Sequence, residues 1–144
     1  MNTFNFKKAF ELKSRRGYDK LFIAVDLHDT VIKGTYTRYN DDRKIYPGCV
    51  EFFQWAKKRK DVVLILWTSS HRDSVDDILK WLNLHGISFD YINENPEVPS
   101  DNLCDFSGKF YFNVLLDDKG GFEGETDWNL IINKLKEIGE WNKL

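Results

Sequence analysis

Carboxylate and hydroxyl side chains stand where three apolar runs of this sequence stop. The runs and the residues that follow them are Leu21 to Val25 before Asp26, Val62 to Trp67 before Thr68, and Phe110 to Leu116 before Asp117 and Asp118. A carboxylate can attack phosphorus and form an aspartyl-phosphate, which water then hydrolyses. Further carboxylates suit Mg²⁺, with water and phosphate oxygens completing its octahedral shell. If these residues meet in space, they predict metal-assisted chemistry on a phosphate.

The runs themselves have the composition of strands that are covered on both faces of a parallel sheet. They are continuous stretches of Val, Ile, Leu and aromatic residues without polar alternation. The carboxyl ends of parallel strands lie at one edge of a sheet, and in open α/β sheets ligands bind in the crevice at that edge. We therefore expect side chains from distant parts of the sequence to meet in one crevice.

Helical patterns alternate with these runs. The predicted elements are a helix within 4–16, strand 20–26, a helix that follows Pro47-Gly48 and ends in 57–60, strand 62–67, a helix from Ser74 as N-cap to Gly86 as stop, strand 89–92, loop 93–108, strand 110–116 and a helix that begins near 126. Such alternation implies right-handed crossovers in a three-layer, Rossmann-like α/β sandwich with a mainly parallel sheet. Residues 33–46 are polar and aromatic, and we expect a loop or a small hairpin flap there.

Length and composition predict a single domain over residues 1–144. Apolar residues make up 42% of the chain, and 21 basic against 23 acidic residues leave a net charge of −2. This balance disfavours nonspecific nucleic-acid binding. The sequence has no apolar run of about 18 residues and no secretion signal, so we expect a cytoplasmic protein without membrane contact. Cys49 and Cys104 match no metal or disulfide pattern and are expected to be reduced thiols.

Asp26 is the candidate nucleophile, and it is also a candidate magnesium ligand together with one or both of Asp117 and Asp118. Neighbouring carboxylates without a cation would raise each other's pKa and repel a phosphate dianion. A divalent cation reverses both effects. The acidic strand ends therefore predict Mg²⁺ as the cofactor.

Phosphoryl transfer also needs groups that stabilise the charge on the transferred phosphoryl oxygens. Thr68 is the candidate hydroxyl donor, and Ser69 or Ser70 could share its role and contact the substrate. Lys109 is the candidate ammonium, with Lys119 as the alternative.

The segment 33–46 contains candidates for substrate recognition. Tyr36, Arg38 and Tyr39 could bind a substrate there by stacking and by charge. His71 could also contact a substrate, but its position favours a surface histidine at the start of a helix.

Together these residues resemble the haloacid dehalogenase superfamily of phosphohydrolases. The four signatures of that family are similar here to Asp26 to Thr30, Thr68, Lys109 and Asp117-Asp118, in the family's order within residues 20–120. The segments Leu66 to Ser70, Phe89 to Pro96 and Leu115 to Lys119 resemble its small members with little or no cap. The resemblance implies that the fourth strand lies beside the first, that Asp117 lies next to Asp26, and that the backbone carbonyl of His28 is a magnesium ligand.

The sequence departs from this family at two positions of the first signature. His28 stands where most family phosphatases have a second aspartate, which protonates the leaving group and later activates water, and Asp29 replaces a glycine. An imidazole, with an ordinary pKa of about 6.5, can carry out this proton transfer at neutral pH. Asp29 either orients the His28 ring or supplies a proton itself.

These patterns predict a Mg²⁺-dependent phosphomonoester hydrolase with an open site, because the insertions are too short for a large cap. An open site suits a nucleotide, another phosphorylated small molecule or the end of a polynucleotide, or a second subunit that acts as the lid of an oligomer. The missing aspartate supports an alternative, a protein that binds phosphate or a nucleotide without efficient hydrolysis, or else a phosphotransferase. Carbon–halogen hydrolysis is disfavoured because it needs an enclosed apolar pocket.

Overall fold

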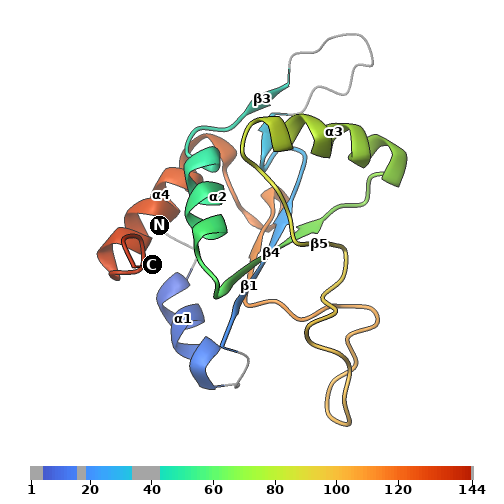
Figure 1. The fold of residues 1–144 in the computed structure, drawn as a ribbon, viewed down its shortest axis with the longest axis vertical. Helices are drawn as coiled ribbons and strands as arrows, with labels where there is room; N and C mark the ends of the chain where they lie inside the picture. The colour runs from blue at the N-terminus through green and yellow to red at the C-terminus, as the bar shows by residue number, and fades with distance from the viewer. Residues whose placement is uncertain (1–4, 16–18, 34–42, 144) are drawn as a thin grey trace.

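The structure of the chain is a computed structural model that describes residues 5–15, 19–33 and 43–143. In chain order its elements are α1 (Phe6–Arg15), β1 (Leu21–Asp26), β2 (Ile32–Lys33), β3 (Lys44–Ile45), α2 (Cys49–Lys58), β4 (Val62–Trp67), α3 (Arg72–Leu84), β5 (Tyr91–Ile92), β6 (Val114–Leu116), the 3₁₀ turn η1 (Asp118–Gly120) and α4 (Gly124–Glu137). The alternation of strands and helices follows the predicted order (Figure 1).

Four parallel strands form the central sheet, in the order β5-β4-β1-β6. Asp26 at the end of β1 is paired with Trp67 of β4, and on the other side of β1 Val25 is paired with Leu116 of β6. The strand order confirms that the fourth predicted strand lies beside the first. The carboxyl ends of β4, β1 and β6 therefore lie together at one edge of the sheet.

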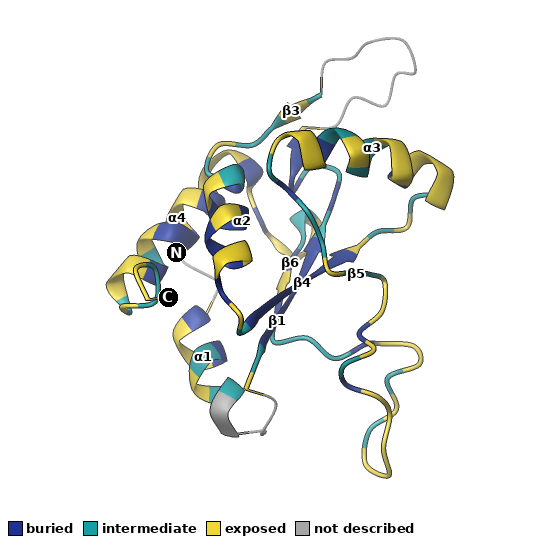
Figure 2. Ribbon diagram, viewed as in Figure 1, coloured by how far each residue is buried: buried dark blue, intermediate teal, exposed yellow. Residues whose placement is uncertain are grey.

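The two faces of the sheet are covered in different ways. Buried side chains of all four helices belong to one large core cluster with residues 21, 23 and 25 of β1 and 62, 64 and 66 of β4. The residues of the second, smaller cluster are Phe22, Ala24, Val63, Ile65, Val98 and Phe110. Val98 and Phe110 belong to residues 93–113, which contain no helix and form the long excursion in Figures 1 and 2. The molecule is therefore a Rossmann-like α/β sandwich with one helical layer and one layer made by a loop.

Right-handed crossovers account for this difference between the faces. The steps from β1 through α2 to β4 and from β4 through α3 to β5 run in the same direction across the sheet, so both helices cover the same face. The step from β5 to β6 runs back in the opposite direction and must cover the other face. Residues 93–113 make this return without a helix, so the predicted loop is confirmed and is longer than expected.

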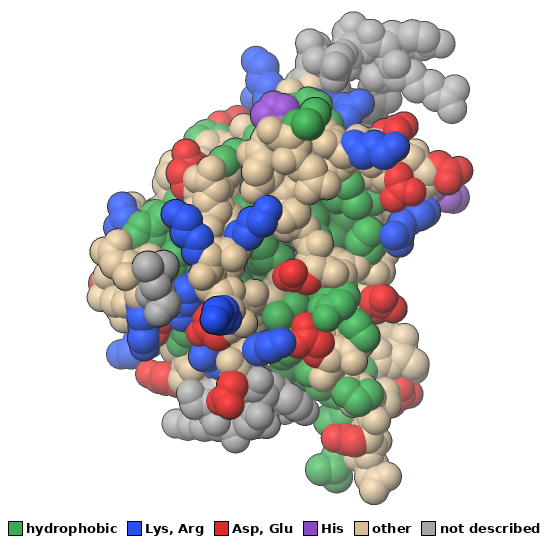
Figure 3. All heavy atoms as spheres, viewed as in Figure 1, with side chains coloured by type: hydrophobic (Ala, Val, Ile, Leu, Met, Phe, Trp, Pro, Cys, Tyr) green, Lys and Arg blue, Asp and Glu red, His purple; other side chains and the backbone are tan. Residues whose placement is uncertain are grey.

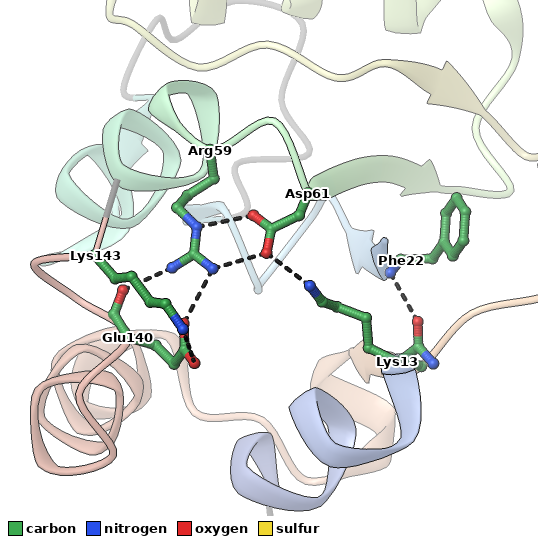
Figure 4. A network of polar contacts seen from close by, with 7 residues as sticks. Lys13, Phe22, Arg59, Asp61, Glu140 and Lys143 are labelled. Atoms are coloured by element: carbon green, nitrogen blue, oxygen red, sulfur yellow. Dashed lines mark hydrogen bonds and ion pairs between the residues drawn. The ribbon is translucent and has the colours of Figure 1, made fainter. Parts of the chain in front are cut away.

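The last strand is shorter than the sequence suggests. The predicted strand 110–116 is wrong over its first four residues, because β6 contains only Val114–Leu116. Asn113 makes a substitute pairing with Phe22: the Asn113 N–H donates to the Phe22 carbonyl at 2.8 Å, and the Phe22 N–H donates to the side-chain oxygen of Asn113 at 2.8 Å (Figure 4). The preceding aromatic residues cover the sheet instead of extending it. β5 is likewise shorter than the predicted strand 89–92.

The ends of two helices differ from their predicted positions. α3 begins at Arg72 with His71 as its N-cap residue, so the prediction of Ser74 as N-cap is wrong. Its predicted end at Gly86 is confirmed, because Gly86 has φ +84° and the Ile87 N–H closes the turn by donating to the Leu82 carbonyl at 3.0 Å. α4 begins at Gly124, two residues before the predicted start.

The predicted flap is present where the structure describes it. Ile32 pairs with Ile45 and Lys33 with Lys44, which makes β2 and β3 a short antiparallel ladder. The rest of the flap, residues 34–42, lies outside the described residues. Tyr36, Arg38 and Tyr39 are among them.

A polar network ties the elements together at the amino ends of the strands, opposite the site edge. The Arg59 guanidinium, 8% exposed, donates twice to Asp61 at 2.8 Å and also to the Glu140 backbone carbonyl at 2.8 Å (Figure 4). Lys13 of α1 donates to Asp61 at 3.0 Å. Figure 3 shows Lys and Arg side chains gathered over this part of the surface. Lys58, Lys60 and Lys143 line a hollow here together with Arg59. The network joins α1, the end of α2 and the segment after α4.

Two further observations concern the described parts of the chain. None of their helices has both the length and the apolar composition needed to cross a membrane. Cys49 is buried, Cys104 is partly buried, and both are free thiols, as predicted.

Candidate active site

Three carboxylates from two neighbouring strands meet at the predicted edge of the sheet. Asp26 ends β1, and Asp117 and Asp118 follow β6, whose residues pair with those of β1. Asp26, Asp117 and Asp118 each offer an oxygen atom, and these atoms all lie within 4.8 Å of one another. The structure thus brings together the carboxylates that the sequence predicted as nucleophile and metal ligands.

Thr30 fixes the relative position of two of these carboxylates. Its side chain is fully buried, and its hydroxyl donates to Asp26 Oδ2 at 3.1 Å while it accepts from the Asp118 N–H at 3.1 Å. The Thr30 carbonyl in turn accepts a hydrogen bond at 2.8 Å from the indole of Trp128, a fully buried residue of α4. The loop after β1 is therefore anchored both to the acidic pair and to the helical layer.

The electrostatics of the cluster favour a cation. The pKa of Asp26 is raised to about 7, chiefly by burial, then by its hydrogen bond with Asp118 and by the charge of Asp117. Hydrogen bonds from the Leu27 backbone and from Thr30 lower it by less. A positive ion among these oxygens would stabilise the ionised form of Asp26.

The cluster opens into a cleft of about 440 Å³ at the carboxyl ends of the strands. The residues that line it are Asp26, His28, Asp29, Trp67, Thr68, Ser69, Ser70, Asp117, Asp118 and Lys119. Most of the predicted catalytic residues therefore share one cavity although they come from three separate parts of the chain.

The two candidate ammonium groups lie in different places. Lys119 lines the cleft, and its backbone N–H donates to Asp117 at 2.9 Å in the turn η1. Lys109 does not line the cleft; it is exposed, and its ammonium lies 5.7 Å from the centre of the Phe112 ring. The structure thus brings the alternative residue, Lys119, to the carboxylates and leaves Lys109 outside the cleft.

Thr68 is held at the end of β4 by a residue that the sequence analysis missed. The side-chain oxygen of Asn93 accepts from the Thr68 N–H at 2.9 Å, and its side-chain nitrogen donates to the Thr68 carbonyl at 2.8 Å. The Thr68 hydroxyl accepts from the Ser70 N–H at 3.2 Å, which leaves its own proton available for a phosphoryl oxygen. The position of Asn93 directly after a predicted strand was the signal that could have identified it.

His28 and Asp29, the two departures from the family pattern, both line the cleft. Asp29 has a positive φ of 62°, and its N–H donates to the Ile32 carbonyl at 2.7 Å in a tight turn. The charge of Asp29 also raises the pKa of Tyr46, although burial contributes more. Both residues therefore border the same cleft as the three carboxylates.

The other predicted substrate contacts are only partly described. Ser69 and Ser70 line the cleft. His71 is exposed at the N-cap of α3 and does not line it. Tyr36, Arg38 and Tyr39 lie outside the described residues. Trp67, the last residue of the second apolar run, also lines the cleft and is 41% exposed.

Comparison with known proteins supports the fold. No family model matches the chain, and no curated protein matches it. The chain is similar to a solved structure of a conserved protein coded by a locus of Bacteroides thetaiotaomicron, with 26% sequence identity and a TM-score of 0.62 over 82% of this chain and 91% of that one. The similarity shows that the two proteins share an α/β sandwich with a parallel sheet.

Proposed function

We propose that this protein is a Mg²⁺-dependent phosphomonoester hydrolase that uses Asp26 as its nucleophile. The observation that carries the proposal is the meeting of Asp26, Asp117 and Asp118, with oxygen atoms within 4.8 Å of one another, in a cleft that also presents Thr68 and Lys119. The order of Asp26, Thr68 and the pair Asp117-Asp118 along the chain supports the resemblance to the haloacid dehalogenase superfamily. We assign the ammonium role to Lys119, which lines the cleft, and not to Lys109. Lys119 follows the acidic pair in the sequence, whereas the lysine of the family's signatures precedes it.

The donor set fits magnesium. Asp26 and one or both of Asp117 and Asp118 would hold it through carboxylate oxygens, the ligands that this hard cation prefers, and the resemblance adds the backbone carbonyl of His28. The raised pKa of Asp26 supports the fit, because a carboxylate crowded by two others is stabilised by a cation. Bound magnesium would supply positive charge that lowers the repulsion between the phosphate and these carboxylates.

Asp26 would carry the covalent step. One of its oxygens forms a bond to phosphorus while the bond from phosphorus to the ester oxygen breaks, and the leaving oxygen takes a proton. Water then attacks the same phosphorus, releases phosphate and restores the carboxylate, and the proton that this water loses passes to a general base. Thr30 would hold the attacking side chain in place through its hydrogen bond to Asp26 Oδ2.

The transferred phosphoryl group would be stabilised by donors from two strand ends. The Thr68 hydroxyl, positioned by Asn93, can donate to one oxygen, and the Lys119 ammonium can neutralise another. His28 would move the proton to the leaving group and later from water, and Asp29 either orients the imidazole or takes this role itself.

Hydrolysis of a chromogenic aryl phosphate with Mg²⁺ or with a chelator tests the proposal. We expect turnover that depends on the metal, falls to background in Asp26→Asn and is unchanged in Leu84→Ala, an exposed control at the end of α3. Turnover that survives Asp26→Asn would contradict the assignment of the nucleophile. A broad panel of phosphate esters without turnover, together with measurable nucleotide binding, would favour the alternative of a binding protein, which the replacement of an aspartate by His28 motivates.

A further inference from the structure

Trp67 is a large aromatic residue exposed directly beside the proposed nucleophile. It is 41% exposed, and it is the residue of β4 that pairs with Asp26 of β1. Residues 22 and 24 of β1 and residues 63 and 65 of β4 face the loop-covered side of the sheet. Because side chains alternate along a strand, Asp26 and Trp67 point toward that same side. Their side chains are therefore neighbours on adjacent strands.

Trp67 also separates the cleft from a second hollow. A groove of about 270 Å³ lies between Trp67 and the loop of residues 93–113, with walls that include Asn93, Asn95, Phe106 and Phe110. Trp67 lines both this groove and the cleft that contains Asp26. A phosphate ester whose phosphorus lies at Asp26 can therefore extend its leaving group across the Trp67 indole into the groove.

The Trp67 indole is held in place by a neighbouring aromatic ring. Its ring centre lies 5.6 Å from that of Phe110 in an edge-to-face arrangement, and Phe110, only 8% exposed, contacts Phe112 in the same way at 5.7 Å. A supported indole that keeps 41% of its surface exposed costs little to order when a flat ring stacks on it. The structure thus provides a rigid stacking surface next to the nucleophile.

The charges around the groove favour an uncharged flat ligand over one that carries a second phosphate. None of the described residues that line it is a lysine or an arginine, and its one charged side chain is Glu94. The nearby Lys109 directs its ammonium to the Phe112 ring. A carboxylate here repels a second phosphate group and can accept a hydrogen bond from an amino group or ring N–H of a ligand.

We propose that the groove beside Trp67 binds the leaving group of the substrate, and that the substrate is a phosphomonoester of an uncharged alcohol carrying a flat, hydrogen-bonding ring, as in a nucleoside monophosphate. The inference rests on the proposed function for its reaction, but the groove and its binding preference are separate properties of the chain. It excludes substrates with a second phosphate in the groove.

Kinetics with two esters test the preference. With adenosine monophosphate, Trp67→Ala is expected to lower kcat/KM by about 5- to 150-fold, the range that corresponds to losing one stacked base. With glycerol phosphate, which has no ring, the same variant should change kcat/KM less than about 3-fold. Trp67→Phe keeps a smaller ring and should recover most of the loss, and Leu84→Ala should match the wild type with both esters. Equal losses with both esters, or no loss with adenosine monophosphate, would overturn the proposal.

A binding measurement separates this inference from the proposed reaction. Adenosine monophosphate should quench tryptophan fluorescence in the Asp26→Asn protein, and this quenching should disappear when Trp67→Phe is added. If this quenching occurs but the wild type hydrolyses none of the phosphate esters, the proposed hydrolase activity is refuted and binding in the groove is supported. If both esters are hydrolysed without such quenching, binding of the leaving group in the groove is refuted and the proposed hydrolase activity is supported.

Discussion

At the scale of single residues, the site depends on a carboxylate kept in an unfavourable environment. Asp26 is partly removed from water and faces two further carboxylates, and its pKa rises to about 7. Thr30 compensates in part by donating a hydrogen bond to it. Such an arrangement lowers stability in the absence of a cation, which is a common cost at functional sites.

The first prediction concerns Asp26→Asn. The folded pKa lies above the unfolded value of 3.8, so the contribution of this group to stability is full below about pH 4 and is lost as the pH rises through about 7. At pH about 8 with a chelator, the variant should therefore be more stable than the wild type, by about 1 kcal/mol once screening by solvent is allowed for. Thermal unfolding measures the difference.

Magnesium provides the control for this prediction. Millimolar Mg²⁺ should raise the Tm of the wild type, because it binds the folded state, and should raise that of Asp26→Asn much less. Equal increases in the two proteins would mean that the cation binds elsewhere.

The second prediction concerns the proton donor. An imidazole has an ordinary pKa of about 6.5 and an aspartate carboxyl one of about 3.9, so His28→Asp should move the limb of the kcat–pH profile at which the acid loses its proton toward lower pH. Activity should be shifted along the pH axis and not abolished. A profile that coincides with that of the wild type would assign the proton transfer to another group, with Asp29 as the first candidate.

At the scale of elements, the ends of short strands decide where the proposed catalytic groups lie. β5 contains only Tyr91–Ile92, yet it brings Asn93 to the edge of the sheet, where the amide holds the backbone of Thr68 on both sides. Asn93 has a positive φ of 55°, a conformation that asparagine tolerates better than most residues. Asn93 is thus a positioning residue that acts through Thr68.

The third prediction uses this backbone conformation. Asn93→Gly removes the two hydrogen bonds without strain, whereas Asn93→Ala also adds strain at a positive φ. Both variants should lower kcat for an aryl phosphate by about 10-fold or more, with a smaller change in KM, because Thr68 is displaced. Only Asn93→Ala should lose substantial additional thermal stability. A kcat in Asn93→Gly equal to that of the wild type would show that Thr68 keeps its position without the two Asn93 hydrogen bonds.

At the scale of the whole molecule, the polar network around Arg59 and the acidic cleft lie at opposite ends of the central strands. The Arg59 network joins α1, the end of α2 and the segment after α4 at the amino ends of the strands, while the acidic cleft lies at their carboxyl ends. Arg59 is also flanked by the rings of Phe10 and Trp55, at 5.5 Å and 5.3 Å. Among the residues that the structure describes, the Arg59 network and the lining of the cleft have no polar residue in common.

The fourth prediction concerns the Arg59 network. Arg59→Ala removes the buried guanidinium from Asp61, which keeps Lys13, and from Glu140, which keeps Lys143. It should lower the free energy of unfolding by about 2 kcal/mol, less than for a fully buried pair because the Asp61 side chain is 24% exposed. Lys143→Ala, which removes an exposed ion pair with Glu140, should cost little. Denaturant unfolding compares the two, and equal effects would contradict the ranking.

Acid unfolding provides a further test of the same network. Hydrogen bonding to Arg59 lowers the pKa of Asp61 to about 2 from an unfolded value of 3.8. Asp61 therefore stabilises the protein fully above about pH 4, and this contribution is lost as the pH falls toward about 2. The stability difference between the wild type and Asp61→Asn should shrink over this interval. A stability difference that stays constant over this pH range would show that Asp61 does not contribute to acid unfolding.

The sequence was sufficient where a property depends on local pattern. The apolar runs predicted the central strands and the parallel sheet, and Gly86 predicted the end of α3, because these features follow from side-chain periodicity and backbone freedom. The sequence also predicted that Asp26 and the pair Asp117 and Asp118 would meet, since parallel strands end at one edge.

Only the tertiary structure decided which residues of similar type reach the cleft. The sequence favoured Lys109 over Lys119 as the candidate ammonium, but Lys109 precedes the short strand β6 and lies outside the cleft, whereas Lys119 lies in the turn η1 and lines it. The roles of Asn93 and Trp67 depend on contacts between strands and across a loop without helical pattern. Local sequence determines which elements form, whereas the packing of distant segments determines which side chains meet, because contacts of that kind have no signature in the residues on either side.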